Sequence, residues 1–218
     1  MIRSVNLFCL VTSTLLFVQG CADQNPKPLE VKLSSQEAES LYASFNLLEQ
    51  TLVEHSPLVH ESLASPASED EIRELRKFLG GVKNQNLEAW YGWHNGCTNR
   101  LYDLIPLGRM LSISESTTDL VEIREIPFVH SRRKRSLKLL EDVAGDGFYI
   151  DLTDSKSRVF YEMLEDPYPT YYGTLDQFLT FIAKVHAAGI VTIDGQGMTS
   201  FPYDVYDRIE NEYLKSLK

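Results

Sequence analysis

The sequence predicts an α+β fold, with an antiparallel or mixed central sheet flanked by helices in a single domain. Apolar residues recur at helical spacing early in the folded region and again near its end, whereas the middle of the chain reads as strands. Helices and strands segregated along the chain in this way are typical of α+β folds. Apolar residues make up 43% of the chain and charged residues 24%, which is the composition of a globular protein.

Residues 1–20 predict an export signal. Arg3 is the only charged residue before residue 23, and an apolar run follows from Leu7 to Val18. A positive end, a short apolar stretch and a small residue before the cleavage point are the features of a secretory signal. The run is too short for a transmembrane helix, which needs roughly 20 apolar residues.

The end of this signal resembles a bacterial lipobox, Val18-Gln19-Gly20-Cys21. The resemblance implies that Cys21 is lipidated and anchors the protein to a membrane. A cleaved signal followed by a chance cysteine is the alternative. Ala22, in place of Asp, favours the outer membrane by the sorting pattern of enteric lipoproteins. We therefore expect a protein of the cell envelope, held on the outer membrane and facing the periplasm.

The rest of the chain divides into a tether, a domain and an extension. Residues 21–35 are polar and contain Pro26 and Pro28, which favours an extended tether. The domain is predicted over residues 36–188, and a strand and helix extension over residues 189–218.

Three helices are predicted in the first part of the domain. The first covers residues 36–54, where apolar residues follow each other at spacings of three and four, and Pro57 ends it. The second begins at a capping box formed by Ser68 and Glu71 and ends at Gly80-Gly81, where glycine permits a positive φ. The third covers residues 86–93.

The middle of the domain predicts strands, and the end predicts a further helix. Phe148, Ile150 and Leu152 alternate along one of these strands, and Asp154–Ser157 has the composition of a hairpin turn. The predicted strands are 101–106, 121–129, 147–152 and 158–164. Thr174 and Gln177 form another capping box, which starts a helix over residues 175–187. A strand at 190–193 and a helix at 203–217 follow.

Several ordered motifs resemble the SMI1/KNR4 (SUKH) superfamily. They are Pro66, Glu71, Leu79-Gly80, Asn95-Gly96, Ile126-Pro127-Phe128, Gly145–Leu152, Val159-Phe160 and Thr174–Leu179. The resemblance spans about residues 38–187. It implies a non-catalytic binding domain, because bacterial members are regarded as immunity proteins that neutralise toxins and fungal members as scaffolds in cell-wall regulation.

Residue patterns for catalysis or metal binding are not found in the sequence. His60-Glu61 begins like a metalloprotease motif, but Ala64 stands where the second histidine belongs. We therefore expect no catalytic residues, no metal site and no cofactor. Asp146, Asp151 and Glu162 could serve acid–base chemistry if one were desolvated. The favoured interpretation is that Asp146 caps a turn and that Asp151 faces solvent.

The charge pattern indicates the class of partner. The formal net charge of −10 repels nucleic acid and favours basic proteins or neutral ligands. The basic run Arg132–Arg135 is expected to be a solvated loop, with a contact to anionic headgroups or to an acidic partner as the alternative.

Tyrosines gather near the predicted hairpin, interleaved with prolines. Tyrosine is enriched at protein interfaces because it offers a large amphipathic area at low entropic cost. The predicted partner-binding residues are Tyr149, Asp151, Tyr161, Tyr168, Tyr171 and Tyr172. We expect a lipid-anchored domain that binds a protein toxin in the manner of an immunity protein. The alternative is an envelope scaffold that binds cell-wall polymer or wall-synthesis machinery.

Overall fold

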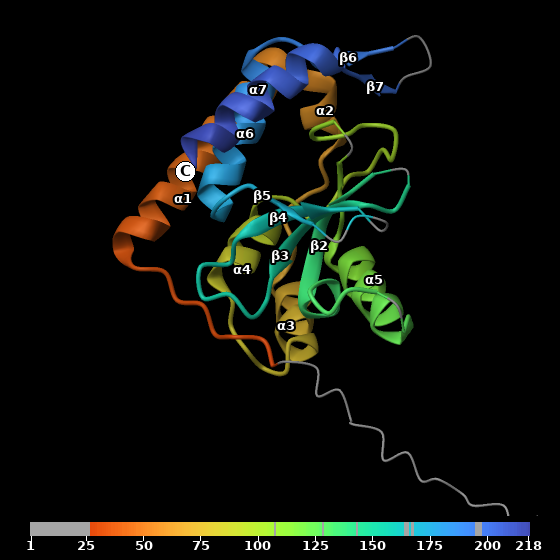
Figure 1. Cartoon of the computed structure of the whole chain (residues 1–218). Helices are drawn as coiled ribbons and strands as arrows, with labels where there is room; N and C mark the ends of the chain where they lie inside the picture. The colour runs from red at the N-terminus through yellow and green to blue at the C-terminus, as the bar shows by residue number, and fades with distance from the viewer. Residues whose placement is uncertain are drawn as a thin grey trace, which may run out of the picture.

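The computed structural model describes residues 27–106, 108–127, 129–142, 144–163, 166, 168–194 and 198–218 (Figure 1). The export signal and Cys21 lie outside these residues. Seven helices, a five-stranded antiparallel sheet and a small two-stranded sheet make up the described chain, so the predicted α+β class is confirmed. Within the described residues, no helix combines the length and the apolar character needed to cross a membrane.

The helices are Ser35–His55 (α1), Pro57–Ser62 (α2), Glu69–Phe78 (α3), Gln85–Trp93 (α4), Ile113–Glu125 (α5), Leu175–Ala187 (α6) and Tyr203–Ser216 (α7), with a 3₁₀ turn at Arg133–Arg135 (η1). The strands are Arg109–Met110 (β1), Ser136–Glu141 (β2), Gly147–Asp151 (β3), Val159–Glu162 (β4), Thr170–Tyr171 (β5), Thr192–Ile193 (β6) and Thr199–Ser200 (β7).

The main sheet is a meander in which every neighbouring pair is antiparallel, in the order β1-β2-β3-β4-β5. Leu140 pairs with Phe148 and Lys138 pairs with Tyr149, and a bulge lies between Lys138 and Leu140. Because side chains alternate along a strand, these pairs occupy opposite faces of the sheet. One face is therefore apolar and the other carries charge.

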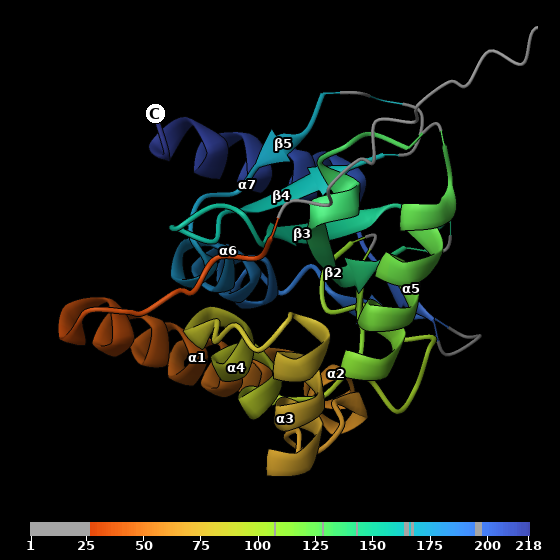
Figure 2. The ribbon, with the colours of Figure 1, turned by 90° about the horizontal axis from the view of Figure 1, so that it is seen from below.

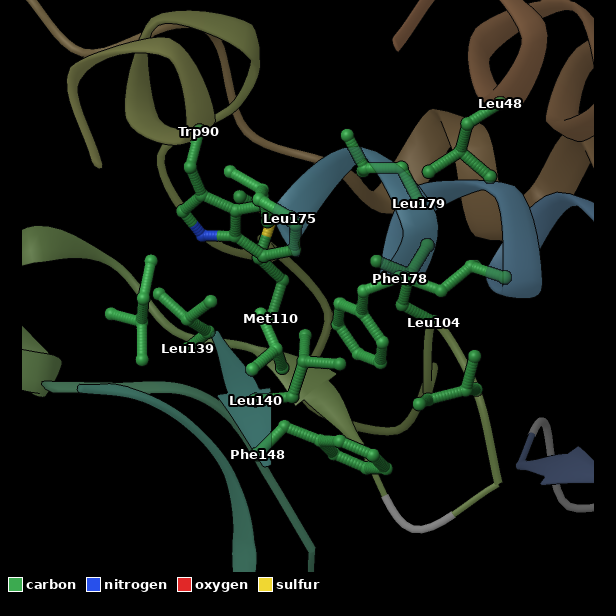
Figure 3. Packing of buried hydrophobic residues seen from close by; sticks show 14 of the residues in the cluster. Leu48, Trp90, Leu104, Met110, Leu139, Leu140, Phe148, Leu175, Phe178 and Leu179 are labelled. Carbon is green, nitrogen blue, oxygen red and sulfur yellow. The ribbon is translucent and has the colours of Figure 1, made fainter. Parts of the chain in front are cut away.

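The apolar face packs on α6 (Figure 3). The rings of Phe148 and Phe178 lie 5.1 Å apart between centroids, and both side chains are buried. Helix α6 lies between the sheet and α1, and α7 packs on α6 (Figures 1 and 2). Each large apolar side chain buried in this core contributes about 1.5–3 kcal/mol, so this contact between α6 and the sheet is a main source of stability.

The opposite face is covered by α5 and η1, and α5 packs along β2. Residues 121–129 were predicted as a strand, and this prediction is wrong because α5 occupies Ile113–Glu125. A capping box formed by Ser112 and Glu115 starts this helix. Residues 101–106 form no strand of the sheet either, although Ile105 makes an isolated bridge to Gly108.

Most helix boundaries agree with the sequence. The capping box of Ser68 and Glu71 is present, Gly80 and Gly81 have φ values of 73° and 83°, and α6 covers the predicted residues. The first helix ends at His55, just before Pro57 as predicted, and Pro57 also stands at the first position of α2. Proline fits there since its missing N–H is not needed in the first turn.

Candidate functional site

The six predicted binding residues divide by burial. Tyr168 is 82% exposed and Tyr171 is 41% exposed, whereas Tyr161 is half-buried. The other three are buried: Tyr149, Asp151 and Tyr172. Of the six predicted binding residues, only Tyr168 and Tyr171 are therefore exposed enough to contact a partner.

Tyr172 connects the sheet to α7. Its hydroxyl donates to Glu210, which also accepts a hydrogen bond from Tyr206 at 3.1 Å. The hydroxyl of Tyr213 donates to the backbone carbonyl of Tyr172 at 2.5 Å. Burial raises the pKa of the Tyr172 hydroxyl, and the neighbouring Tyr206 and Glu210 raise it further. This tyrosine stabilises the packing of α7 against the end of the sheet.

Tyr149 lies on the charged face of the sheet, where its ring is enclosed. The guanidinium of Arg133 lies 5.0 Å and the ammonium of Lys138 lies 5.6 Å from the ring centroid. The ring of Phe160 stacks beside it at 5.6 Å. Cation–π contacts of this kind strengthen when they are shielded from water. Tyr149 therefore helps to hold the buried cations.

The basic run was expected to be a solvated loop, and this prediction is wrong. Arg133 is 3% exposed and donates to the backbone carbonyl of Glu162 at 2.5 Å and to Asp146 at 3.3 Å. Arg132 donates to the Glu162 carboxylate at 2.9 Å, and Arg135 pairs with Asp151 at 3.5 Å. Buried charges need such partners because their desolvation is costly.

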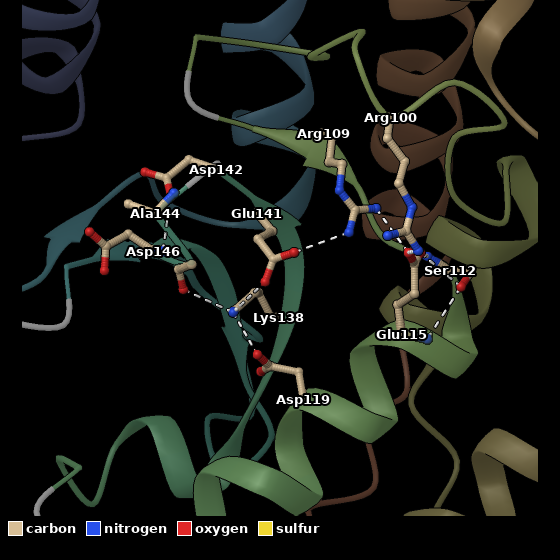
Figure 4. Close-up of polar contacts among 11 residues, drawn as sticks. Arg100, Arg109, Ser112, Glu115, Asp119, Lys138, Glu141, Asp142, Ala144 and Asp146 are labelled. Carbon is tan, nitrogen blue, oxygen red and sulfur yellow. Dashed lines mark hydrogen bonds and ion pairs between the residues drawn. The ribbon is translucent and has the colours of Figure 1, made fainter.

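Lys138 is the centre of the charged face (Figure 4). Its ammonium donates to Asp119 at 2.5 Å, to Glu141 at 3.0 Å and to the carbonyl of Gly145 at 3.0 Å. A lysine has three donors, and all three are used here. Burial raises the pKa of Asp119, and the charge of Lys138 opposes that effect. The geometry supports a structural role for this lysine.

The same network continues to β1. Arg109 donates to Glu141 at 3.1 Å and to Glu115 at 3.0 Å, and Arg100 also donates to Glu115 at 3.0 Å (Figure 4). Glu115 belongs to the capping box of α5, so these ion pairs connect the start of α5 with the sheet.

Two carboxylates, Asp142 and Asp151, accept hydrogen bonds from turns beside the sheet, and Asp151 differs from its expected role. The turn before β3 is capped by Asp142, whose side chain accepts the N–H groups of Ala144 at 2.8 Å and Asp146 at 3.0 Å. Asp151 was expected to face solvent, yet it is 8% exposed and accepts two hydrogen bonds from Thr153, at 2.8 and 2.6 Å. Both carboxylates therefore order turns next to the sheet.

The exposed tyrosines lie on or next to β5, which is one of the two edge strands of the sheet. Both residues of β5 are exposed, and β5 pairs with β4 along one side. A hollow of about 460 Å³ adjoins β5 and is lined by Arg158, Thr170, Tyr171, Gly173, Leu214, Leu217 and Lys218. The guanidinium of Arg158 lies 5.3 Å from the centroid of the Tyr171 ring. We call Tyr168, β5 and this hollow the β5 edge.

No protein-family model matches the chain, and a search of curated proteins finds no significant match.

Proposed function

We propose that this protein is a lipid-anchored, non-catalytic domain of the cell envelope that binds a protein toxin through the β5 edge, as an immunity protein does. The observation that supports it best is the exposure of Tyr168 and Tyr171 beside an outermost strand and a hollow. The ordered motifs that resemble the SUKH superfamily, and the lipobox-like sequence at Cys21, add to the proposal.

The β5 edge fits an extended segment of the partner. An outermost strand can accept another strand through backbone hydrogen bonds, and pockets beside it then select side chains. In the hollow, Leu214 and Leu217 offer an apolar surface, and positive charge comes from Lys218 and from Arg158, which also pairs with Asp154 at 2.5 Å. An apolar residue followed by an acidic one would fit this lining. The net charge of −10 would attract a basic partner at longer range and increase the association rate.

Crosslinking in the native envelope tests the proposal. A photoreactive phenylalanine analogue is placed at Tyr168 in the full chain, and the same analogue at Tyr42 is the control. Tyr42 is 62% exposed and lies on α1, away from the β5 edge. A secreted toxin captured from position 168 and not from position 42 supports the proposal.

Two results would contradict it. Wall-synthesis proteins or peptidoglycan fragments captured from position 168 would indicate the envelope scaffold. Equal capture from positions 168 and 42 would show that the β5 edge has no specific partner.

A further inference from the structure

Three metal-ligating side chains meet at a place where the sequence suggested none. Glu49 lies on α1, His60 lies on α2, and His94 directly follows α4. One ligand atom of each lies within 4.8 Å of the others. From this geometry we propose that Glu49, His60 and His94 bind a divalent transition-metal ion, with Zn²⁺ as the expected ion. The inference is independent of the proposed toxin binding.

The spacing is close to what Zn²⁺ requires. With bonds of about 2.0–2.1 Å, tetrahedral ligand atoms stand about 3.3 Å apart. His94 Nε2 lies 3.4 Å from Glu49 Oε2, which matches this separation. His60 Nε2 lies 2.7 Å from the other oxygen, Glu49 Oε1, and one ligand atom of each residue lies within 4.8 Å of the others, so a small adjustment of the carboxylate is needed on metal binding. Rotation of the glutamate side chain can supply that change.

A backbone hydrogen bond orients His94 as a metal ligand. Its Nδ1 lies 2.6 Å from the carbonyl oxygen of Ala64. A carbonyl oxygen only accepts, so Nδ1 carries the proton and a neutral His94 presents the lone pair of Nε2 to Glu49. Histidines that ligate metals usually donate their other N–H to a carbonyl or carboxylate in this way.

The carboxylate opposite His94 also favours a cation between them. Glu49 Oε2 already accepts the Trp93 indole N–H at 2.9 Å, and it faces the Nε2 lone pair of a neutral His94 at 3.4 Å. Two acceptors that face each other repel unless a proton or a metal ion lies between them. A divalent ion would satisfy both acceptors and the imidazole of His60 at once.

A neighbouring side chain orients one of the proposed ligands, and all three ligands remain accessible from solvent. The Trp93 ring meets the His94 ring edge-on at 4.6 Å, which fixes the imidazole plane. The side chains of His94, His60 and Glu49 are 15%, 29% and 39% exposed, so an ion can enter from solvent. Two imidazoles and one carboxylate form a ligand set that leaves a fourth tetrahedral position for water or an outside ligand.

The test measures metal binding to the full chain purified in detergent. The protein is stripped with a chelator and titrated with Zn²⁺ against a chromophoric competitor, and then with Co²⁺, whose visible absorption reports tetrahedral geometry. We expect one equivalent of Zn²⁺ to bind. Glu49→Gln, His60→Ala and His94→Ala should each weaken binding at least about tenfold. His130→Ala removes an exposed histidine elsewhere and should leave binding unchanged.

Thermal unfolding provides the second readout. Zn²⁺ should raise the Tm of the wild type and of His130→Ala, but not the Tm of Glu49→Gln. Because glutamine keeps the shape of the glutamate side chain, this variant still provides a test if a histidine variant fails to fold. Absence of saturable Zn²⁺ binding by the wild type would overturn the proposal. Wild-type affinity in both Glu49→Gln and His60→Ala would overturn it as well.

Discussion

His186 is buried on α6 between two polar groups. Its Nε2 lies 2.6 Å from the carbonyl oxygen of Leu104, and its Nδ1 lies 2.7 Å from the hydroxyl of Ser56. The carbonyl requires Nε2 to be the donor, so Nδ1 of the neutral ring accepts from Ser56. Burial lowers the pKa of His186 from 6.5 to about 4. A second proton, on Nδ1, would remove the hydrogen bond that this nitrogen accepts from Ser56.

This histidine should make stability fall in acid. Between pH 6.5 and 4 the unfolded chain binds a proton that the folded chain excludes, so the free energy of unfolding decreases as the pH falls. The contribution of His186 is complete above pH 6.5 and about 3 kcal/mol of it is lost by pH 4. His186→Gln keeps a donor and an acceptor without titrating. Urea unfolding at pH 7 and pH 4.5 should show a smaller decrease for this variant.

Asp103 has the opposite effect on how stability depends on pH. Comparison of the wild type with His186→Gln cancels this effect. Burial raises the pKa of Asp103 to about 6, so its contribution to stability is lost as the pH rises from 3.8 to 6. Both the wild type and His186→Gln retain Asp103. An equal acid dependence in the two proteins would therefore exclude His186 as its cause.

Tyr168 should be a hot spot if the β5 edge binds a partner. It is 82% exposed in the unbound protein, and burial of such a ring at an interface commonly contributes about 1–2 kcal/mol. Tyr168→Ala should weaken binding of the crosslinked partner about tenfold in a titration with purified proteins. Tyr42→Ala should keep the wild-type affinity, and equal weakening by both substitutions would argue against the β5 edge.

At the scale of elements, Lys138 and Asp119 join β2 to α5. Both lie where desolvation is costly, and Lys138 is 2% exposed. Lys138→Met leaves Asp119 without its cation, and we expect a loss of about 3–5 kcal/mol in urea unfolding. Replacement of both partners, as Lys138→Met with Asp119→Leu, should recover most of this loss. Lys156→Met, at an exposed turn, is the control.

A double variant as unstable as Lys138→Met would show that the pair contributes more than charge compensation. The free energy of unfolding recovered by removing both charges depends on how well Met and Leu fill the space. In the double variant, Glu141 and the carbonyl of Gly145 lose Lys138 as a donor and would need water in its place.

Helices with local signals could be predicted from the sequence, and elements fixed by distant contacts could not. Ser68 and Glu71 identified α3 because the side chain of each accepts a hydrogen bond from the backbone N–H of the other. The same signal at Ser112 and Glu115 was missed, and part of α5 was predicted as the strand 121–129. Strand β2 escaped prediction because its central residue, Lys138, is charged, and one of the partners that allow its burial, Asp119, lies on α5.

The residues of the candidate sites could also be predicted from the sequence only in part. Tyr168 and Tyr171 were found by residue type, since tyrosines interleaved with prolines can be recognised in a sequence, and the structure shows that both are exposed. The buried positions of Tyr149 and Tyr172 depend on Arg133 and on α7, which lie far along the chain. Glu49, His60 and His94 come from three helical segments, and their spacing follows no linear metal motif.

At the scale of the whole molecule, the proposed lipid at Cys21 would fix the domain to a membrane surface. Cys21→Ala should abolish incorporation of an alkyne fatty acid and release the protein into the soluble fraction of the envelope. Cys97→Ala is the matched control, because Cys97 is a free cysteine in the folded part and burial raises its thiol pKa. Lipid incorporation that persists in Cys21→Ala would reject Cys21 as the site.

The bulge in β2 limits how this protein can change over evolution. It sets Lys138 on the charged face and Leu140 on the apolar face, with Leu139 between them. Side chains alternate with a period of two, so loss or gain of one residue here would turn the residues on one side of the bulge to the opposite face. Either Lys138 would then lie on the apolar face or Leu140 would lie on the charged face. We expect point substitutions in this strand among descendants of the gene, but no single-residue insertions or deletions.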